Sequence, residues 1–230
     1  QALASVLNVY HDYWRGQLRE GALPVLELPL DFARPATQTF NGGVVPLSLP
    51  AELTTRLAAA ARAHGCTLFQ LVLAVWGLLL CRHAGQEEVV VGCPYHGRDA
   101  VGTAGLVGYF VNVLPLRVGA ARGGTVGALL RGAREAAVGA MAHAALPLQL
   151  LAHEELPRRA HDASRNPVFQ TMLAWEERGG WGSGIDAMLF GANVGIQPVR
   201  RELNTAKVEL TLSASEAASG GIDGAIEYNR

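Results

Sequence analysis

The sequence predicts an α/β fold in which a central mixed sheet is flanked by helices. Segments with apolar residues three and four positions apart alternate along the chain with short runs rich in Val, Ile and Leu. One run, EEVVVGCP at 87–94, is continuously apolar from Val89 to Cys93, which is typical of a strand buried on both faces. Half of the 230 residues are hydrophobic, which is enough for a sizeable core.

Helical periodicity and end signals predict five helices. The first ends near Gly21, and Pro50 and Gly65 mark the start and the end of the second. Thr67 is the predicted N-cap of the third helix, and Pro147 begins the last. The expected helices cover residues 3–21, 51–64, 67–83, 125–143 and 147–155.

Short apolar runs, alternating or continuous, predict the strands of the sheet. Segments rich in glycine at 97–108 and 177–199 are predicted to be loops, because glycine and proline interrupt regular structure. The expected strands lie near 44–49, 88–93, 109–117, 168–175, 205–214 and 221–229.

Composition excludes several classes of protein. A formal net charge of −1 provides no electrostatic basis for binding nucleic acid or an anionic membrane. The longest apolar run covers 15 residues (67–81), whereas a membrane-spanning helix needs about 20. Cys66, Cys81 and Cys93 have neither metal-ligand nor disulfide spacing, which suits a reducing cytoplasm. The chain begins with Gln and ends directly after a strand-like run, so we expect a piece of a longer polypeptide.

No known catalytic or metal-binding motif is complete in this sequence. Cys93 and His96 are close together, but Cys93 continues an apolar run and is predicted to be a small buried hydrophobe. The chain has no G-x-S-x-G, no G-x-x-x-x-G-K-[ST] and no H-E-x-x-H, so we predict no metal site. None of the seven histidines has an Asp four residues later; the nearest spacing is His96 with Asp99.

Six stretches, in order along the chain, resemble motifs of the condensation domains of nonribosomal peptide synthetases. YWRGQLREGALPVLELPLDFARP is similar to YW…L…LPTDRPRP, and VVVGCPYHGRD after the apolar helix is similar to VVVGTPIAGR. LVGYFVNVLPLR is similar to IGFFVNTLPLR, and HAALPLQLL to HQDLPFEQL. HDASRNPVFQTML is similar to RDLSRNPLFQVMF, and AKVELTL…IDGAIEYN to AKFDLTL…LRGSIEYN. The similarity extends over nearly the whole chain.

These domains have two lobes of chloramphenicol-acetyltransferase-like fold, and the resemblance implies that residues 1–230 are the C-terminal lobe. The family's catalytic H-H-x-x-x-D-G motif belongs to the first lobe and is expected upstream, so no catalytic residue is predicted in this chain. Residues 1–36 would be the helix and extended segment that connect the lobes, and 176–202 would be a latch loop. Four apolar residues of that loop are expected to contact the other lobe: Trp181, Met188, Leu189 and Phe190.

The resemblance implies amide-bond formation between aminoacyl or peptidyl thioesters, and SRNPVFQ at 164–170 favours this reaction over epimerisation or cyclisation. The implied partners are the N-terminal lobe, donor and acceptor peptidyl carrier domains and an adjacent adenylation domain. The carrier domains would bring 4'-phosphopantetheine, with no cofactor bound directly by this chain. Two other functions stay open: a non-catalytic carrier-protein binding module, and an acyltransferase that takes its His from a neighbouring subunit.

Asn112 is an unusual residue for the apolar strand in which it stands, because a buried amide without partners is costly. Strand alternation places Phe110, Asn112 and Leu114 on one face, which the resemblance implies lines the substrate tunnel between the lobes. Val111 and Val113 would then pack on helices. Asn112 is expected to bond the thioester or a pantetheine amide. The alternative is that its amide bonds neighbouring backbone and shapes the strand.

Five further residues have expected roles through the resemblance. Cys93 and Tyr95 stand where relatives have Thr and Ile, in a loop near the tunnel, and would alter the shape of the tunnel. Arg98 is expected to position that loop. Asp162 and Arg165 are expected to form a structural ion pair that ties the DASRNP segment to the body of the lobe.

Overall fold

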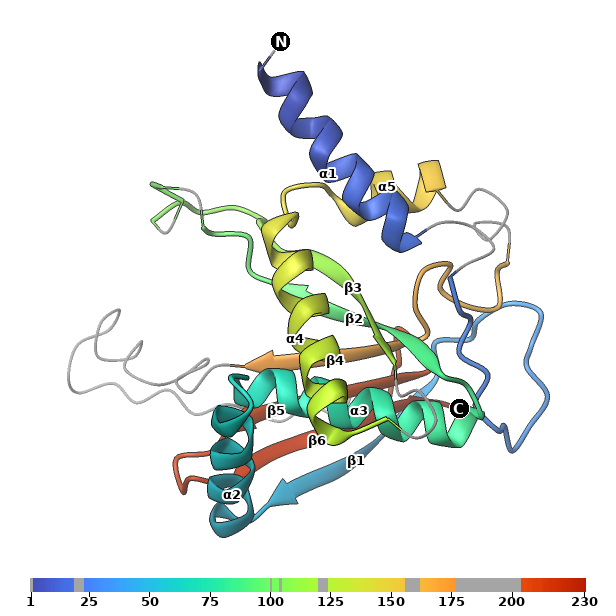
Figure 1. The fold of residues 1–230 in the computed structure, drawn as a ribbon. Coiled ribbons are helices and arrows are strands. Elements are labelled where there is room, and N and C mark those ends of the chain that lie inside the picture. Colours follow the sequence, from blue (N-terminus) through green and yellow to red (C-terminus); the bar gives the residue numbers. More distant parts are fainter. Residues whose placement is uncertain are drawn as a thin grey trace, which may run out of the picture.

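The computed structural model describes residues 2–18, 23–99, 101–103, 105–119, 124–155, 162–176 and 204–230. Within these ranges the chain forms a six-stranded mixed sheet with helices packed against it (Figure 1). The predicted α/β class with a central mixed sheet is therefore confirmed.

All five predicted helices are present. They are α1 (Ala2–Leu18), α2 (Ala51–Ala63), α3 (Leu68–Ala84), α4 (Val126–Ala142) and α5 (Leu148–Glu155). Thr67 caps α3 as expected: its hydroxyl accepts from the N–H of Gln70 at 3.2 Å, and the Gln70 side chain accepts from the N–H of Thr67 at 3.0 Å. Gly85 ends α3 in a left-handed conformation with φ of 66°, which glycine adopts without strain. Helix α1 is described as far as Leu18, and the predicted helix end near Gly21 lies outside the described residues.

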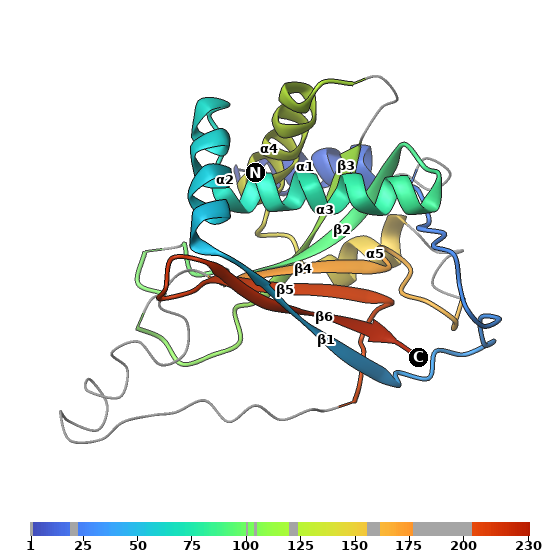
Figure 2. The same ribbon diagram turned by 90° about the horizontal axis from the view of Figure 1, so that it is seen from below.

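The six strands lie in the spatial order β1–β6–β5–β4–β2–β3. They are β1 (Gly42–Leu49), β2 (Glu88–Tyr95), β3 (Asn112–Gly119), β4 (Thr171–Glu176), β5 (Leu210–Glu216) and β6 (Ile222–Asn229). The neighbours β2, β4 and β5 run parallel, and the remaining pairs are antiparallel. Figure 2 shows α2, α3 and α4 together on one side of the strands.

Two strand boundaries near the predicted site differ from the sequence prediction. β2 continues to Tyr95, which pairs with Asn112, so Cys93 and Tyr95 lie in a strand and not in a loop. β3 starts at Asn112 instead of residue 109. Beyond this pair the backbones of Gly97 and Phe110 still approach closely: a Cβ on Gly97, whose φ is 66°, would be 2.1 Å from the Phe110 carbonyl oxygen.

β4 and β5 also start later than predicted, because side chains and local bridges hold the preceding residues in other conformations. The Asn166 side chain accepts from the N–H groups of Val168 and Phe169 at 2.9 and 3.2 Å, which forms a turn before β4. Thr205 forms an isolated bridge with Asn41, and regular pairing of β5 begins only at Leu210.

The core surrounds β2, which is buried on both faces as the sequence predicts. On one face Val91 is fully buried among residues of the helix layer, and on the other the ring of Phe169 lies directly over Gly92. Trp76 of α3 is buried and donates its indole N–H to the Thr171 hydroxyl of β4 at 3.1 Å. This bond joins the central helix to the middle of the sheet.

No single helix in the described ranges is long and apolar enough to cross a membrane. The pair α2 and α3 reaches the required length and composition together, but the two helices meet at 98°. Much of α3 is buried against other elements of the chain, as expected for a core helix.

We predict opposite effects of alanine at two helical glycines. A Cβ on Gly77 of α3 would be 2.4 Å from Cγ2 of the buried Val118, whereas one on Gly132 of α4 meets no atom within 4 Å. Gly77→Ala should lower the free energy of unfolding by about 1–3 kcal/mol through overpacking. Gly132→Ala should raise it by about 0.5–1 kcal/mol through helix propensity. Urea unfolding followed by circular dichroism measures both, and stabilisation at Gly77 would contradict the packing described.

Candidate functional site

The carboxyl ends of the parallel strands β2, β4 and β5 meet at one edge of the sheet. Loops at this edge of α/β sheets commonly carry functional residues. The described residues of segment 96–111, which are all but Ala100 and Ala104 and which we call the β2–β3 loop, leave the sheet here and extend away from its strands (Figure 1). Arg98 and Phe110 lie on it, Tyr95 and Asn112 are the residues at its two ends, and Cys93 lies within β2 just before Pro94 and Tyr95.

Arg98 organises the described part of the β2–β3 loop. Its Nη1 donates to the carbonyl oxygens of Thr103 and Leu106 at 2.7 and 2.8 Å, and its Nη2 donates to that of Gly108 at 3.2 Å. The guanidinium also lies 4.3 Å from the ring centroid of Phe110. One side chain thus replaces the backbone partners that a continued strand ladder would have supplied. The predicted loop-positioning role of Arg98 agrees with these contacts.

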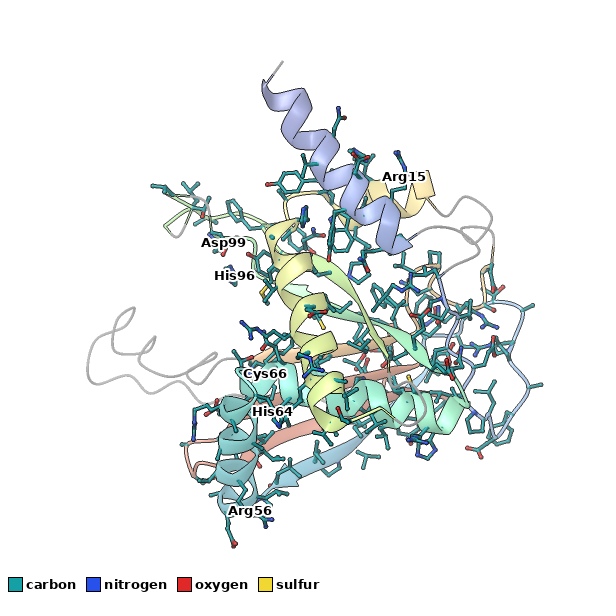
Figure 3. The ribbon with its side chains drawn as sticks, in the orientation of Figure 1. Arg15, Arg56, His64, Cys66, His96 and Asp99 are labelled. Carbon is teal, nitrogen blue, oxygen red and sulfur yellow. The ribbon has the colours of Figure 1, made fainter. Side chains whose placement is uncertain are left out.

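Tyr95, His96 and Asp99 form a polar cluster where the loop leaves β2. The Tyr95 hydroxyl donates to Asp99, and the Tyr95 ring stacks on His96 with centroids 4.9 Å apart. His96 Nδ1 accepts from the N–H of Arg98 at 3.0 Å, which leaves Nε2 directed to Asp99 at 3.7 Å. Burial, together with the adjacent Asp99 carboxylate, raises the pKa of Tyr95 to about 12. Figure 3 shows His96 and Asp99 side by side on the loop.

Cys93 is buried on the helix-covered face of β2. Removal from water raises the pKa of its thiol well above the usual range. The protonated thiol is a poor nucleophile, so the environment supports the predicted packing role. The expectation that Cys93 lies in the tunnel loop is wrong, because β2 extends past this residue.

The face assignment predicted for Asn112 is also wrong. Leu114 and Val118, which share its face of β3, are buried, and Val118 contacts α3 at Gly77. The Asn112 side chain therefore points to the helix layer, and it bonds the chain there. Its Nδ2 donates to the carbonyl oxygens of Ala144 and Leu146, both at 2.9 Å. These contacts correspond to the alternative interpretation, in which the amide bonds neighbouring backbone.

The second pair of predicted residues lies before β4, at the opposite edge of the sheet from the β2–β3 loop. Arg165 Nε is 3.2 Å from Asp162 Oδ2, and Arg165 Nη1 is 2.7 Å from Glu27 Oε1. Ser164 donates to Asp162 through its hydroxyl at 2.6 Å and its N–H at 2.9 Å, which lowers the pKa of the Asp162 carboxyl. The predicted ion pair is present, and Glu27 is its link to the rest of the chain.

Sequence reasoning missed three residues that the structure places at these contacts. Gln170 is buried; its Oε1 accepts from the N–H of Leu26 at 2.8 Å, and its Nε2 donates to the Asn166 carbonyl oxygen at 2.9 Å. A polar amide at the start of an apolar strand was the available signal for it. Glu27 and His143 had no such signal, because their partners are distant in sequence: Glu27 pairs with Arg165, and His143 stacks on Tyr13 and accepts from the Trp14 indole N–H through its carbonyl oxygen.

The latch segment expected at 176–202 lies outside the described residues from 177 onward, so its contacts stay a prediction. Across the described ranges, no three His, Cys, Asp or Glu side chains gather in a way that could hold a metal ion.

Comparison with known proteins places this arrangement in a family. A sequence model described as "Condensation domain" matches residues 7–230. A linear gramicidin synthase of Brevibacillus parabrevis is 35% identical over 226 residues, which cover 98% of this chain and 4% of that protein. Malpinin synthetase of Mortierella alpina is 35% identical over 223 residues, which cover 97% of this chain and 3% of that protein.

Solved structures share the fold. The X-domain from teicoplanin biosynthesis has a TM-score of 0.82 with 28% identity, over 96% of this chain and 49% of that chain. The condensation domain of the Monacolin K polyketide synthase has a TM-score of 0.76 with 22% identity, over 99% of this chain and 53% of that chain. The chain belongs to the condensation-domain family, and its fold is the chloramphenicol-acetyltransferase-like fold of these domains. It spans only a few per cent of the length of the curated synthetases that it matches.

We predict that Arg98→Lys loosens the β2–β3 loop without unfolding the sheet. Lysine offers one ammonium group and cannot reach three carbonyl oxygens with the fixed fork of a guanidinium. Amide hydrogen exchange of residues 105–110 should become about tenfold faster, with exchange in β5 and β6 unchanged. Arg131→Lys, at an exposed position of α4, is the matched control. Unchanged exchange in the loop would show that Arg98 does not organise it.

Proposed function

We propose that this chain is the C-terminal half of a condensation domain that forms amide bonds in nonribosomal peptide synthesis. One observation carries the proposal: the family match runs from residue 7 to the last residue, while the chain covers about half of solved relatives, 49% and 53% of two of them. The sequence also contains no H-H-x-x-x-D-G motif. The catalytic His would be supplied by the N-terminal half.

In this proposal the chain supplies one wall of the reaction site. Amide formation from a thioester requires an acceptor amine and a donor carbonyl to be held in line, so positioning is a large part of the catalysis. The His of the other half would orient or deprotonate the amine. The β2–β3 loop is a suitable wall because Arg98 holds its base, while Val101, Val107 and Tyr109 are exposed. Exposed apolar side chains of this kind favour coverage by another part of the protein.

The proposed partners follow from the same reaction. Donor and acceptor carrier domains would deliver the acyl groups on 4'-phosphopantetheine arms, and an adenylation domain would load a carrier. Tyr95 and Phe110, at the two ends of the loop, are the residues of this chain that we propose near the arms. Cys66, Cys81 and Cys93 are buried and form no disulfide, which is compatible with a reducing cytoplasm.

A second candidate function is a carrier-recruiting module of the same fold without chemistry. The exposed apolar residues of the β2–β3 loop favour it equally, because a binding surface needs no catalytic His. The two functions differ only in turnover, so one experiment separates them.

We predict that residues 1–230 alone form no peptide bond, whereas the synthetase module containing them does. Mass spectrometry of carriers loaded with donor and acceptor aminoacyl groups detects a dipeptidyl thioester on the acceptor. Replacing the second His of the upstream motif by Ala should remove at least about 99% of the product, since general base catalysis typically contributes 10²–10⁴-fold.

Two outcomes would contradict the proposal. Product from residues 1–230 alone would place the catalytic groups in this chain. Carrier binding without product, in a module with an intact His motif, would favour the recruiting module.

A further inference from the structure

Helix α5 has no side chain of its own to cap its N-terminus. The carbonyl oxygen of Pro147 accepts from the N–H groups of Leu150 and Leu151, so Pro147 occupies the N-cap position. Proline has no side-chain acceptor, and the two residues Ala144 and Ala145 offer none either. The first N–H groups of a helix need partners, and Ser, Thr, Asp or Asn usually supply one.

Asn112 supplies this missing cap from a different element. Its Oδ1 accepts from the N–H of Leu148, the first residue of α5, at 3.2 Å, and from the N–H of Val113 at 2.9 Å. Its Nδ2 donates to the carbonyl oxygens of Ala144 and Leu146. A side-chain amide has two N–H donors and two oxygen lone pairs, and all four are used. No hydrogen-bonding capacity is left for a substrate.

Helix α1 contacts the segment that joins α4 to α5. The indole N–H of Trp14 donates to the carbonyl oxygen of His143 at 2.8 Å, and Trp14 is fully buried. The ring of Tyr13 stacks on the His143 ring with centroids 4.0 Å apart and planes 5° apart. Residues 143–148, which we call the α4–α5 connection, are therefore clamped between β3 and α1. Helix α1 also contacts α5 directly.

We propose that Asn112 is a positioning residue for condensation, which acts by capping α5 and fixing the α4–α5 connection and with it α1. The inference rests on the proposed function and on the expectation from the sequence that residues 1–36, which include α1, connect this half to the half that carries the catalytic His. Strand β3 begins at Asn112, where the β2–β3 loop ends, so a single amide links that loop to α5. A shift of α5 and α1 would change how the two walls of the reaction site face each other, and small misplacements strongly reduce rates.

The test uses the complete synthetase module in four variants: Asn112→Ala, Pro147→Asp, the two combined, and Thr125→Ala. Pro147→Asp gives α5 an N-cap of its own that accepts from N–H groups in the first turn. Thr125→Ala is the matched control, because Thr125 caps α4 by accepting from the N–H of Ala128 at 3.2 Å, the same length as the Asn112 cap. Amide hydrogen exchange and steady-state condensation kinetics are measured on each protein.

We expect Asn112→Ala to accelerate exchange at 148–151 and in α1 by about tenfold or more, with β5 and β6 unchanged. The kcat for condensation should fall by about tenfold, with the KM for loaded carriers unchanged, because carrier binding does not involve the amide. Adding Pro147→Asp should restore most of the protection from exchange at 148–151 and in α1, and most of the kcat. Thr125→Ala should leave kcat within about twofold of the parent.

The following outcomes would overturn the inference or the proposed function on which it rests. A loss of kcat with unchanged exchange, or one that Pro147→Asp does not restore, would mean that Asn112 acts on the substrate directly. Faster exchange with unchanged kcat would mean that the position of α5 is irrelevant to the reaction. An inactive parent with an intact His motif would contradict the proposed function itself, while the exchange data would still decide whether Asn112 caps α5.

Discussion

The burial of β2 between β3 and β4 is the constraint on which the rest of this structure depends. The strand pairs antiparallel with β3 on one side and parallel with β4 on the other, and both of its faces are covered. Gly92 has no room for a side chain, because a Cβ there would be 2.6 Å from the Phe169 ring. Such a strand cannot shift its register without exposing apolar side chains, so the position of the loop that follows is determined by the core.

At the end of β2 the backbone leaves the sheet, and side chains must satisfy the polar groups that the ladder no longer pairs. Arg98 does this for three carbonyl oxygens of the β2–β3 loop, and Tyr95 with Asp99 fixes the point of departure. The loop thus combines an ordered base with exposed apolar residues. A surface that is held in place before binding loses less conformational entropy when a partner covers it.

Asn112 illustrates how one polar residue in an apolar strand can be interpreted in two ways. The cost of burying an unpaired amide indicated that Asn112 must have partners, and that inference is correct. Three of its four partners are backbone groups of the α4–α5 connection, more than 30 residues later in the chain. Strand alternation correctly grouped Asn112 with Leu114, but the assignment of that face to the tunnel is wrong, because Leu114 and Val118 on the same face are buried beneath the helices. The same amide thus replaces a cap that α5 lacks.

Local patterns were sufficient to predict the α/β class, all five helices, the strands and the burial of β2, because hydrophobic periodicity and helix ends depend on near neighbours. The Asp162–Arg165 pair, whose members are three residues apart, was expected through the resemblance of the DASRNP segment to the family. Tertiary structure decided where strands stop, which face Asn112 occupies, and that Glu27, 138 residues away, completes the Arg165 pair. These features depend on contacts between residues distant in sequence, and the spacing of residues along one chain does not specify them.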